Sequence, residues 1–169
     1  MTLPTPARAY LLAALDNTPA TLAALLSALG PSDPAWDARP HPDRFTLREV
    51  VAHLADWEQI WEDRFARTAA EDNPTLARPD AGDRGAAQGY ASADPAESLA
   101  RFRERRAALT AALRALPEAA WAGRTAHLER IGDLTPGGLV ALALGHDAYH
   151  LRQTAEYLAD GPASGQGRA

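Results

Sequence analysis

The sequence has no cysteine and no lysine among its 169 residues, and these two absences exclude several kinds of chemistry. Without cysteine there is no disulfide, no thiolate metal ligand and no thiol nucleophile supplied by the chain. Without lysine there is no Schiff base between the protein and a carbonyl substrate. Any metal site must therefore use nitrogen and oxygen ligands, and any reacting thiol must arrive with a cosubstrate.

The chain also lacks a surplus of positive charge. Its formal net charge of -5 leaves no basic excess for neutralising phosphates, so nucleic acid and anionic membranes are not expected partners. The four arginines between residues 101 and 106 alternate with other side chains, and most of them are expected to splay around a solvated helix. No signal-peptide pattern and no apolar run of about 18 residues is found, which favours a soluble, cytoplasmic protein.

One domain is expected, because 169 residues with 46% hydrophobic content suffice for a single core. We place this domain at residues 1–162 and a disordered tail at 163–169. Leucines spaced by three and four residues predict a first helix over 11–29, bent at Pro19 and stopped at Gly30. Thr46 and Glu49 form a capping box that predicts the start of a second helix.

Two further helices follow a long segment without periodicity. Asp94 caps a third helix that extends to about Leu116, and residues 117–121 predict one short turn. Thr135-Pro136 opens the last helix, and Gly161-Pro162 closes it. Residues 31–44 are read as a loop anchored by Trp36, and residues 73–92 as a long loop over one end of the domain. Four helical patterns without strand alternation predict an all-α four-helix bundle, whose long later connections permit something other than simple up-down topology.

Two histidines in the last helix have the spacing of a metal-binding pair. His146 and His150 are four residues apart, which places both imidazoles on one helical face, one turn apart. Such a pair also occurs in helices by chance. His53 lies on an apolar stripe of the second helix with Trp57 and Ile60, so it is expected to point into the bundle. Three inward histidines without partner acids favour a divalent-metal site over three separate core histidines.

The histidine spacing is shared with the zinc-protease motif HExxH, but the chemistry differs. Asp147 stands in place of the catalytic glutamate and lies about 100° away from the histidine stripe on the helix. Its side chain is also shorter. Protease activity is therefore not expected, and Asp147 is assigned to a neighbouring helix interface.

Two sequence stretches resemble the DinB/YfiT-like proteins, and a third fits their pattern. The stretches are residues 45–58 around His53, residues 145–153 around the histidine pair, and residues 127–135 before the last helix. The resemblance implies a four-helix bundle in which His53, His146 and His150 hold a metal. It also implies a thiol transferase using bacillithiol or mycothiol, a thiol-dependent isomerase or a metal-dependent hydrolase, and a possible homodimer.

Three neutral imidazoles would leave coordination positions open, which is typical of catalytic and not of structural metal sites. Zinc or nickel is expected, and manganese or iron(II) is compatible with the same ligands. A low-molecular-weight thiol cosubstrate fits a chain without cysteine. The opposing hypothesis is a stress-response or interaction module whose metal only ties two helices together. A domain that has lost its metal is a third alternative, which the presence of all three histidines disfavours.

Supporting roles near the ligands are assigned by helical spacing. Gln153 and Tyr157 follow His150 on the same face, where either could contact substrate or orient a ligand. Core packing is an equal alternative for Tyr157. Asp56 lies one turn beyond His53 and is a candidate acceptor for a ligand or a general base, with an ordinary salt bridge as the alternative.

Three more residues are candidates for the walls of the site. Arg64 lies three turns from His53 and would bind the carboxylate of a thiol cosubstrate or pair with an internal acid. His127 precedes the last helix and would line the mouth of the site. Tyr90, in the 73–92 loop, would close over the pocket as a lid.

Overall fold

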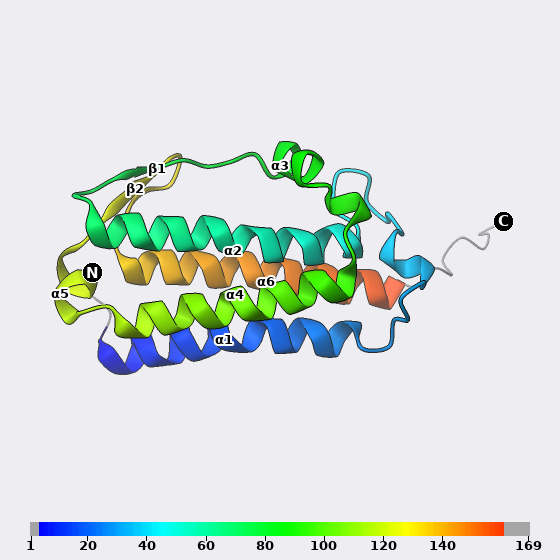
Figure 1. The fold of residues 1–169 in the computed structure, drawn as a ribbon, viewed down its shortest axis with the longest axis horizontal. Helices are drawn as coiled ribbons and strands as arrows, with labels where there is room; N and C mark the ends of the chain where they lie inside the picture. The colour runs from blue at the N-terminus through cyan, green and yellow to red at the C-terminus, as the bar shows by residue number, and fades with distance from the viewer. Residues whose placement is uncertain (1–3, 161–169) are drawn as a thin grey trace.

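Four long helices form the body of the protein in the computed structural model, which describes residues 4–160. They are α1 (Thr5–Leu26), α2 (Leu47–Ala70), α4 (Pro95–Ala115) and α6 (Pro136–Asp160). Both α1 and α2 pack against α4 and α6, so the helices that follow one another first in the chain lie diagonally. The predicted four-helix bundle is confirmed (Figure 1).

The connection between α2 and α4 runs along the bundle. The colours of Figure 1 show that α2 and α4 point in the same direction, while α1 and α6 point the other way. Two parallel neighbours need a crossover that returns along their full length. The segment 71–94 makes this return beside α2, so the prediction of a loop over one end of the bundle is wrong. It contains β1 (Thr75–Leu76), α3 (Ala81–Gln88) and the 3-10 turn η2 (Tyr90–Ser92).

A small sheet at one end of the bundle was not predicted. The parallel strands β1 and β2 (Ala126–Leu128) pair Thr75 with His127, and β2 pairs antiparallel with β3 (Gly132–Leu134). Strands of two or three residues are too short to show a periodic pattern in sequence. The short helix α5 (Glu118–Gly123) confirms the turn expected near residue 117. Another 3-10 turn, η1 (Pro34–Trp36), buries the predicted anchor Trp36.

The helix starts follow local capping. The Thr46 hydroxyl accepts from the Glu49 N–H and the Glu49 carboxylate accepts from the Thr46 N–H, which confirms the capping box. Asp94 caps α4 as predicted. Helix α1 begins earlier than expected, includes Pro19, and ends at Leu26 instead of Gly30. The carbonyl of Gly30 instead accepts from the Trp36 indole N–H, which fixes the turn. The predicted helix stop at Gly161-Pro162 and the predicted tail lie outside the described residues.

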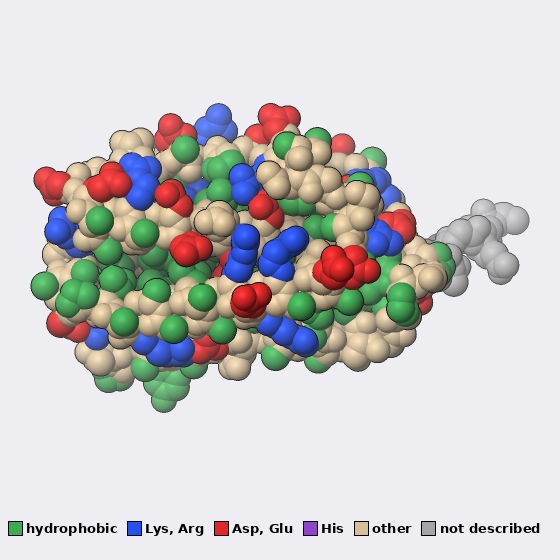
Figure 2. Space-filling view, viewed as in Figure 1, with side chains coloured by type: hydrophobic (Ala, Val, Ile, Leu, Met, Phe, Trp, Pro, Cys, Tyr) green, Lys and Arg blue, Asp and Glu red, His purple; other side chains and the backbone are tan. Residues whose placement is uncertain are grey.

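Side chains of the long helices form two apolar clusters. The cluster toward the sheet includes Trp61 and Trp121, and the other includes Trp36 and Phe102. Tyr149 on α6 is 50% exposed. Helix α1 is long and apolar enough to cross a membrane by length and composition, which is weak evidence because core helices pass the same test. Figure 2 shows acidic and basic side chains interspersed over the face formed by α2 and α4.

A buried ionic network joins the four long helices. Arg106 on α4 donates to both carboxylate oxygens of Glu58 on α2 and to those of Asp147 on α6, and also to the Leu15 carbonyl of α1. All three charged side chains are at most 2% exposed. Arg106 therefore does not belong to a solvated arginine run. Asp147 lies at a helix interface, as predicted.

Candidate metal centre

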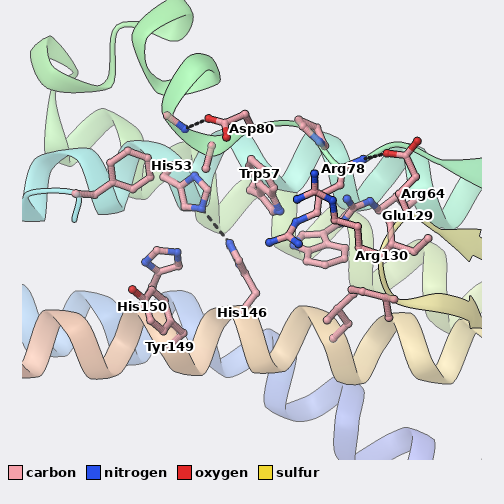
Figure 3. Close-up of a pocket in the computed structure, with 18 of the residues that line it drawn as sticks. His53, Trp57, Arg64, Arg78, Asp80, Glu129, Arg130, His146, Tyr149 and His150 are labelled. Carbon is pink, nitrogen blue, oxygen red and sulfur yellow. Dashed lines mark hydrogen bonds between the residues drawn. The ribbon is translucent and has the colours of Figure 1, made fainter. Parts of the chain in front are cut away.

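Three imidazoles meet between α2 and α6. His53 extends from α2, while His146 and His150 extend from successive turns of α6, and all three point into the space between the helices (Figure 3). The Nε2 atoms of His53 and His146 lie 2.9 Å apart. One potential ligand atom from each ring lies within 4.8 Å of the other two. The structure thus brings together the three histidines singled out in the sequence.

The helical periodicity explains this convergence. His53 shares a buried stripe of α2 with Val50 and Trp57, one turn to either side. The neighbouring helix α6 runs antiparallel to α2, so its two histidines face this stripe from the opposite wall. His146 and His150 lie 93 and 97 positions after His53 in the sequence. They meet His53 because packing in the bundle aligns α2 with α6.

Burial keeps the rings of His53 and His150 neutral. His53 and His150 are 2% and 6% exposed. Burial, with added repulsion from His146 and His150, lowers the pKa of His53 to about 2. Burial and the nearby His146 likewise lower the pKa of His150 to about 3. Both rings therefore keep a free nitrogen lone pair at physiological pH, which is the form that binds a metal.

Gln153 fixes the orientation of His150. Its amide nitrogen donates to the Phe45 carbonyl, which only accepts, so its Oε1 must face His150. This oxygen lies 3.1 Å from His150 Nδ1. Because an amide oxygen only accepts, Nδ1 carries the ring proton and Nε2 keeps its lone pair. Gln153 also lines the cavity, so its expected roles of orienting His150 and of contacting substrate stay predictions.

Aromatic rings hold the other two histidines. Trp57 stacks on His146 with ring centres 5.7 Å apart and an interplanar angle of 16°. Phe45 and Trp57 pack on His53 at 5.1 and 4.7 Å. Within the described part of the chain, the buried Nδ1 atoms of His53 and His146 have no hydrogen-bond partner. The Asp147 carboxylate lies 3.8 Å from His146 Nδ1, too far for a hydrogen bond.

The three rings open into a cavity of about 710 Å³. This volume is in the range of small-molecule sites. Figure 3 shows the histidines at one part of the cavity and several arginines toward the sheet. Its walls come from α2, α6, the segment 78–82 and the turn between β2 and β3. A ligand can therefore touch the histidines and the sheet end of the cavity together.

Two candidates from the sequence, Asp56 and Tyr90, pair with each other. The Asp56 carboxylate accepts from the Tyr90 hydroxyl at 2.6 Å and forms an ion pair with Arg84. The described structure shows no hydrogen bond from Asp56 to a histidine, which favours the salt-bridge alternative. Tyr90 is 2% exposed and packs behind His53, with ring centres 5.9 Å apart. Tyr90 is therefore a buried residue behind His53 and does not line the cavity. Its hydroxyl is held by Asp56, so it does not act as the predicted lid.

The remaining candidates occupy different places. Arg64 lines the cavity, is 4% exposed, and donates to the Ala77 carbonyl. Tyr157 is buried in the core beside Gln153 and does not line the cavity. His127 lies on β2 with an exposed side chain that contacts Asp133, so the prediction that it lines the mouth is wrong. Alternation along β2 turns its side chain away while Leu128 faces inward.

Other cavity residues were missed in the sequence. Arg78 and Arg130 line it from the segment after β1 and from the β2–β3 turn. Trp61 on α2, which is buried in the core, also forms part of the wall. A lone arginine in an irregular segment carries no periodic signal. Only the fold brings these segments beside α2.

Comparison with known proteins places the chain in a family. The family model described as the DinB superfamily matches residues 14–154. A search of curated proteins finds no match. Among solved structures, YfiT from Bacillus subtilis aligns with a TM-score of 0.84 and 23% sequence identity, over 94% of this chain and 90% of that one. YfiT is described as a probable metal-dependent hydrolase with an unusual four-helix bundle topology. The family match covers most of the chain, and the protein therefore belongs to the DinB superfamily.

Proposed function

We propose that this protein is a divalent-metal-dependent enzyme that acts on a small molecule through His53, His146 and His150. The observation that carries the proposal is the convergence of three imidazoles at the wall of an open cavity, with those of His53 and His150 buried and neutral. Ordinary core histidines hydrogen-bond to surrounding groups. Here, among the described residues, two buried Nδ1 atoms have no partner, and the Nε2 atoms of His53 and His146 face each other.

The donor set suits a divalent metal. Imidazole nitrogens bind zinc at about 2.0–2.1 Å, which places neighbouring ligands about 3.0–3.4 Å apart. The 2.9 Å between the Nε2 atoms of His53 and His146 is close to that range. Zinc and nickel are our first candidates, with manganese and iron(II) compatible. When bound by three neutral ligands, such a metal is a Lewis acid that lowers the pKa of a coordinating water or thiol.

The protein's own residues would orient the ligands and limit water. Gln153 keeps Nε2 of His150 free of a proton, and Trp57 and Phe45 shield the imidazoles on their inner side. The side of the cavity away from these rings stays open to a ligand. Such an arrangement supports catalysis more than a closed structural site, in which the protein fills every coordination position.

Two reaction classes are consistent with this site. Hydrolysis is supported by the similarity to YfiT, described as a probable metal-dependent hydrolase. Transfer of a low-molecular-weight thiol is supported by the absence of cysteine and by the resemblance to thiol transferases of the family. A cytoplasmic location would give access to such thiols, and a homodimer is compatible with the family resemblance.

The test begins with metal content. Purified protein is analysed for metals by mass spectrometry and reloaded separately with zinc, nickel and manganese. Each form is then assayed with bacillithiol or mycothiol plus an electrophile, and with 4-nitrophenyl esters without thiol. We expect one metal ion per chain and turnover that His150→Ala abolishes. His127→Ala is the matched control, because it removes a histidine outside the cavity.

The alternative is a stress-response or interaction module in which the metal only links α2 to α6. It predicts the same metal content and a lower melting temperature after chelation, but no turnover in any assay. Metal content that is negligible, or equal in the wild type and in His150→Ala, would contradict both proposals. Turnover unaffected by His150→Ala would contradict the catalytic one.

A further inference from the structure

Three arginines gather in the cavity between the histidines and the sheet. Arg64 comes from α2, Arg78 from the segment after β1, and Arg130 from the β2–β3 turn. Figure 3 shows their side chains directed into the same part of the cavity, beside Trp57 and beyond His146. Three separate segments of the chain thus deliver positive charge to one place in a protein whose formal net charge is -5.

In the described structure, none of these three guanidinium groups has a carboxylate partner. Salt bridges are formed by Arg8, Arg39, Arg44, Arg48, Arg67, Arg84, Arg106, Arg114 and Arg152, but not by Arg64, Arg78 or Arg130. Arg67 shows the contrast, because it lies one turn from Arg64 on the same helix and donates twice to Glu71. Arg101, Arg103, Arg105 and Arg124 also form no salt bridge in the described structure, but they do not line this cavity, where three unpaired cations lie together.

Arg64 is the most deeply buried of the three arginines, so its unpaired charge is the least favourable for folding. It is 4% exposed, and its only hydrogen bond in the described structure goes to the Ala77 carbonyl. Its buried Nε has no partner. Burial lowers the pKa of the Arg64 guanidinium, and repulsion from Arg78 adds to this, although the nearby Asp63 carboxylate acts in the opposite direction. A buried cation beside a second cation, with donors left over, is stabilised by an anion that binds between them.

Arg130 adds a separate observation from the backbone. It has a φ of 66°, in the left-handed region that residues other than glycine and asparagine rarely adopt. Such a conformation is strained for a side chain with a Cβ, and strain of this kind clusters at functional sites. The turn places a long cationic side chain in the cavity at a position where glycine would relieve the backbone.

The carboxylates in this part of the cavity accept hydrogen bonds from backbone N–H groups. Asp80 accepts from the N–H groups of Gly82 and Asp83 at the start of α3. Glu129 accepts from the backbone N–H of Arg78. Neither carboxylate forms an ion pair with the cavity arginines in the described structure. The arginine donors thus remain available to a ligand.

We propose that Arg64, Arg78 and Arg130 form an oxyanion subsite, and that the substrate carries a carboxylate or phosphoryl group at the end away from its reacting atoms. The assignment of a substrate rests on the proposed function, because it requires the reacting end to lie at the histidines. The subsite itself depends only on the arginines. Guanidinium groups bind both kinds of oxyanion through paired N–H donors, so the two are distinguished by experiment.

The first measurement uses metal-free protein, so that it does not depend on catalysis. Inorganic phosphate, glutarate and the uncharged 1,5-pentanediol are titrated while the arginine Nε–H resonances are followed by NMR. We expect saturable shifts with phosphate or glutarate, including the Arg64 resonance, and none with the diol. Tighter binding of one anion identifies the phosphoryl or the carboxylate class.

Variants then test the individual arginines. Arg78→Gln and Arg130→Gln change exposed side chains at the cavity rim, so both should fold, which circular dichroism checks. Each should weaken anion binding about tenfold or more, as expected for loss of a charge-assisted hydrogen-bonding partner. Arg67→Gln is the matched control and should bind as the wild type does. Equal affinity in all four proteins, or no saturable binding, would overturn the subsite.

The metal-loaded enzyme separates this inference from the proposed function. Mono-4-nitrophenyl glutarate and uncharged 4-nitrophenyl pentanoate are compared as substrates in the hydrolysis assay, and 3-mercaptopropionate and 3-mercaptopropanol in the thiol assay. Arg78→Gln should raise KM about tenfold for the anionic member of each pair only. Anion binding without turnover would leave the subsite standing and contradict the enzyme. Turnover without anion binding, or equal KM changes within a pair, would contradict the subsite.

Discussion

The Gln153 side chain holds His150 through an oxygen that lies 3.1 Å from Nδ1, and its own orientation is set by the Phe45 carbonyl. The Phe45 carbonyl thus fixes the Gln153 amide, and the amide in turn fixes the His150 imidazole. Such a partner keeps the ring in the position and the tautomer that a metal needs. Because Phe45 immediately precedes the capped start of α2, the helix that carries His53 also orients a ligand on α6.

Replacing this amide should weaken metal binding. We expect Gln153→Ala to reduce zinc affinity about 10–100-fold, because partners of ligating histidines typically contribute that much. Competition with a chromophoric chelator measures the change. Arg152→Ala is the control, since that side chain is exposed and, among the described residues, forms an ion pair with Glu156. Equal affinities for the two variants would show that Gln153 does not orient His150.

Acid should destabilise the metal-free protein through the histidines. The pKa values of His53 and His150 are lowered from 6.5 to about 2 and about 3 in the folded state. Below about pH 6.5 the unfolded chain therefore takes up protons that the folded protein does not, and stability falls as pH falls. Each histidine contributes a slope of about 1.4 kcal/mol per pH unit between its two pKa values.

Urea denaturation of chelator-treated protein between pH 7.5 and pH 5 measures this slope. His53→Leu should flatten it by roughly the share of one histidine. His127→Ala should leave it unchanged, because that side chain is exposed on the sheet. A slope in His53→Leu equal to that of the wild type would exclude the buried imidazoles as its source.

The buried network around Arg106 should be sensitive to removal of its single cation. Arg106→Met leaves Glu58 and Asp147 buried without their partner, and we expect the free energy of unfolding to fall by about 3–5 kcal/mol. Chemical denaturation measures the loss. Arg103→Met, an exposed position on the same helix, should change stability by less than about 0.5 kcal/mol. Similar losses in both variants would argue against a special role for the network.

Chelation should lower the melting temperature, because the ligands belong to two helices that pack against each other. A ligand bound only by the folded state stabilises it by about 2.7 kcal/mol at a concentration one hundred times its Kd. Calorimetry with and without excess zinc measures the difference. His53→Ala should remove the dependence on zinc. A zinc effect that persists in this variant would place the stabilising ion elsewhere.

Features with a local or periodic signal could be predicted from the sequence. The capping box at Thr46 depends on residues three positions apart, and His146 and His150 lie one turn apart on the same face of a helix. The inward direction of His53 follows from its apolar stripe. The bundle and its three-histidine cluster therefore follow from repeating helical patterns, together with the family resemblance.

Features made by contacts between distant segments could not be predicted. β1 and β2 are two and three residues long and about fifty residues apart, so neither carries a readable pattern. The cavity arginines become neighbours only through the return of the chain along α2. The pairing of Arg106 depends on two acids from other helices, which the run of arginines does not indicate. Tyr90 and His127 were misplaced for the same reason.

The segment between α2 and α4 is fastened at two points. Near its start β1 pairs with β2, and near its end Arg84 and Tyr90 are held by Asp56 on α2. The residues between these attachments, 78–82, form one wall of the cavity. A wall secured on both sides does not swing outward as a hinged flap does, so the aperture keeps its width. The width of this opening would then limit which ligands enter by their size, before any reaction at the histidines.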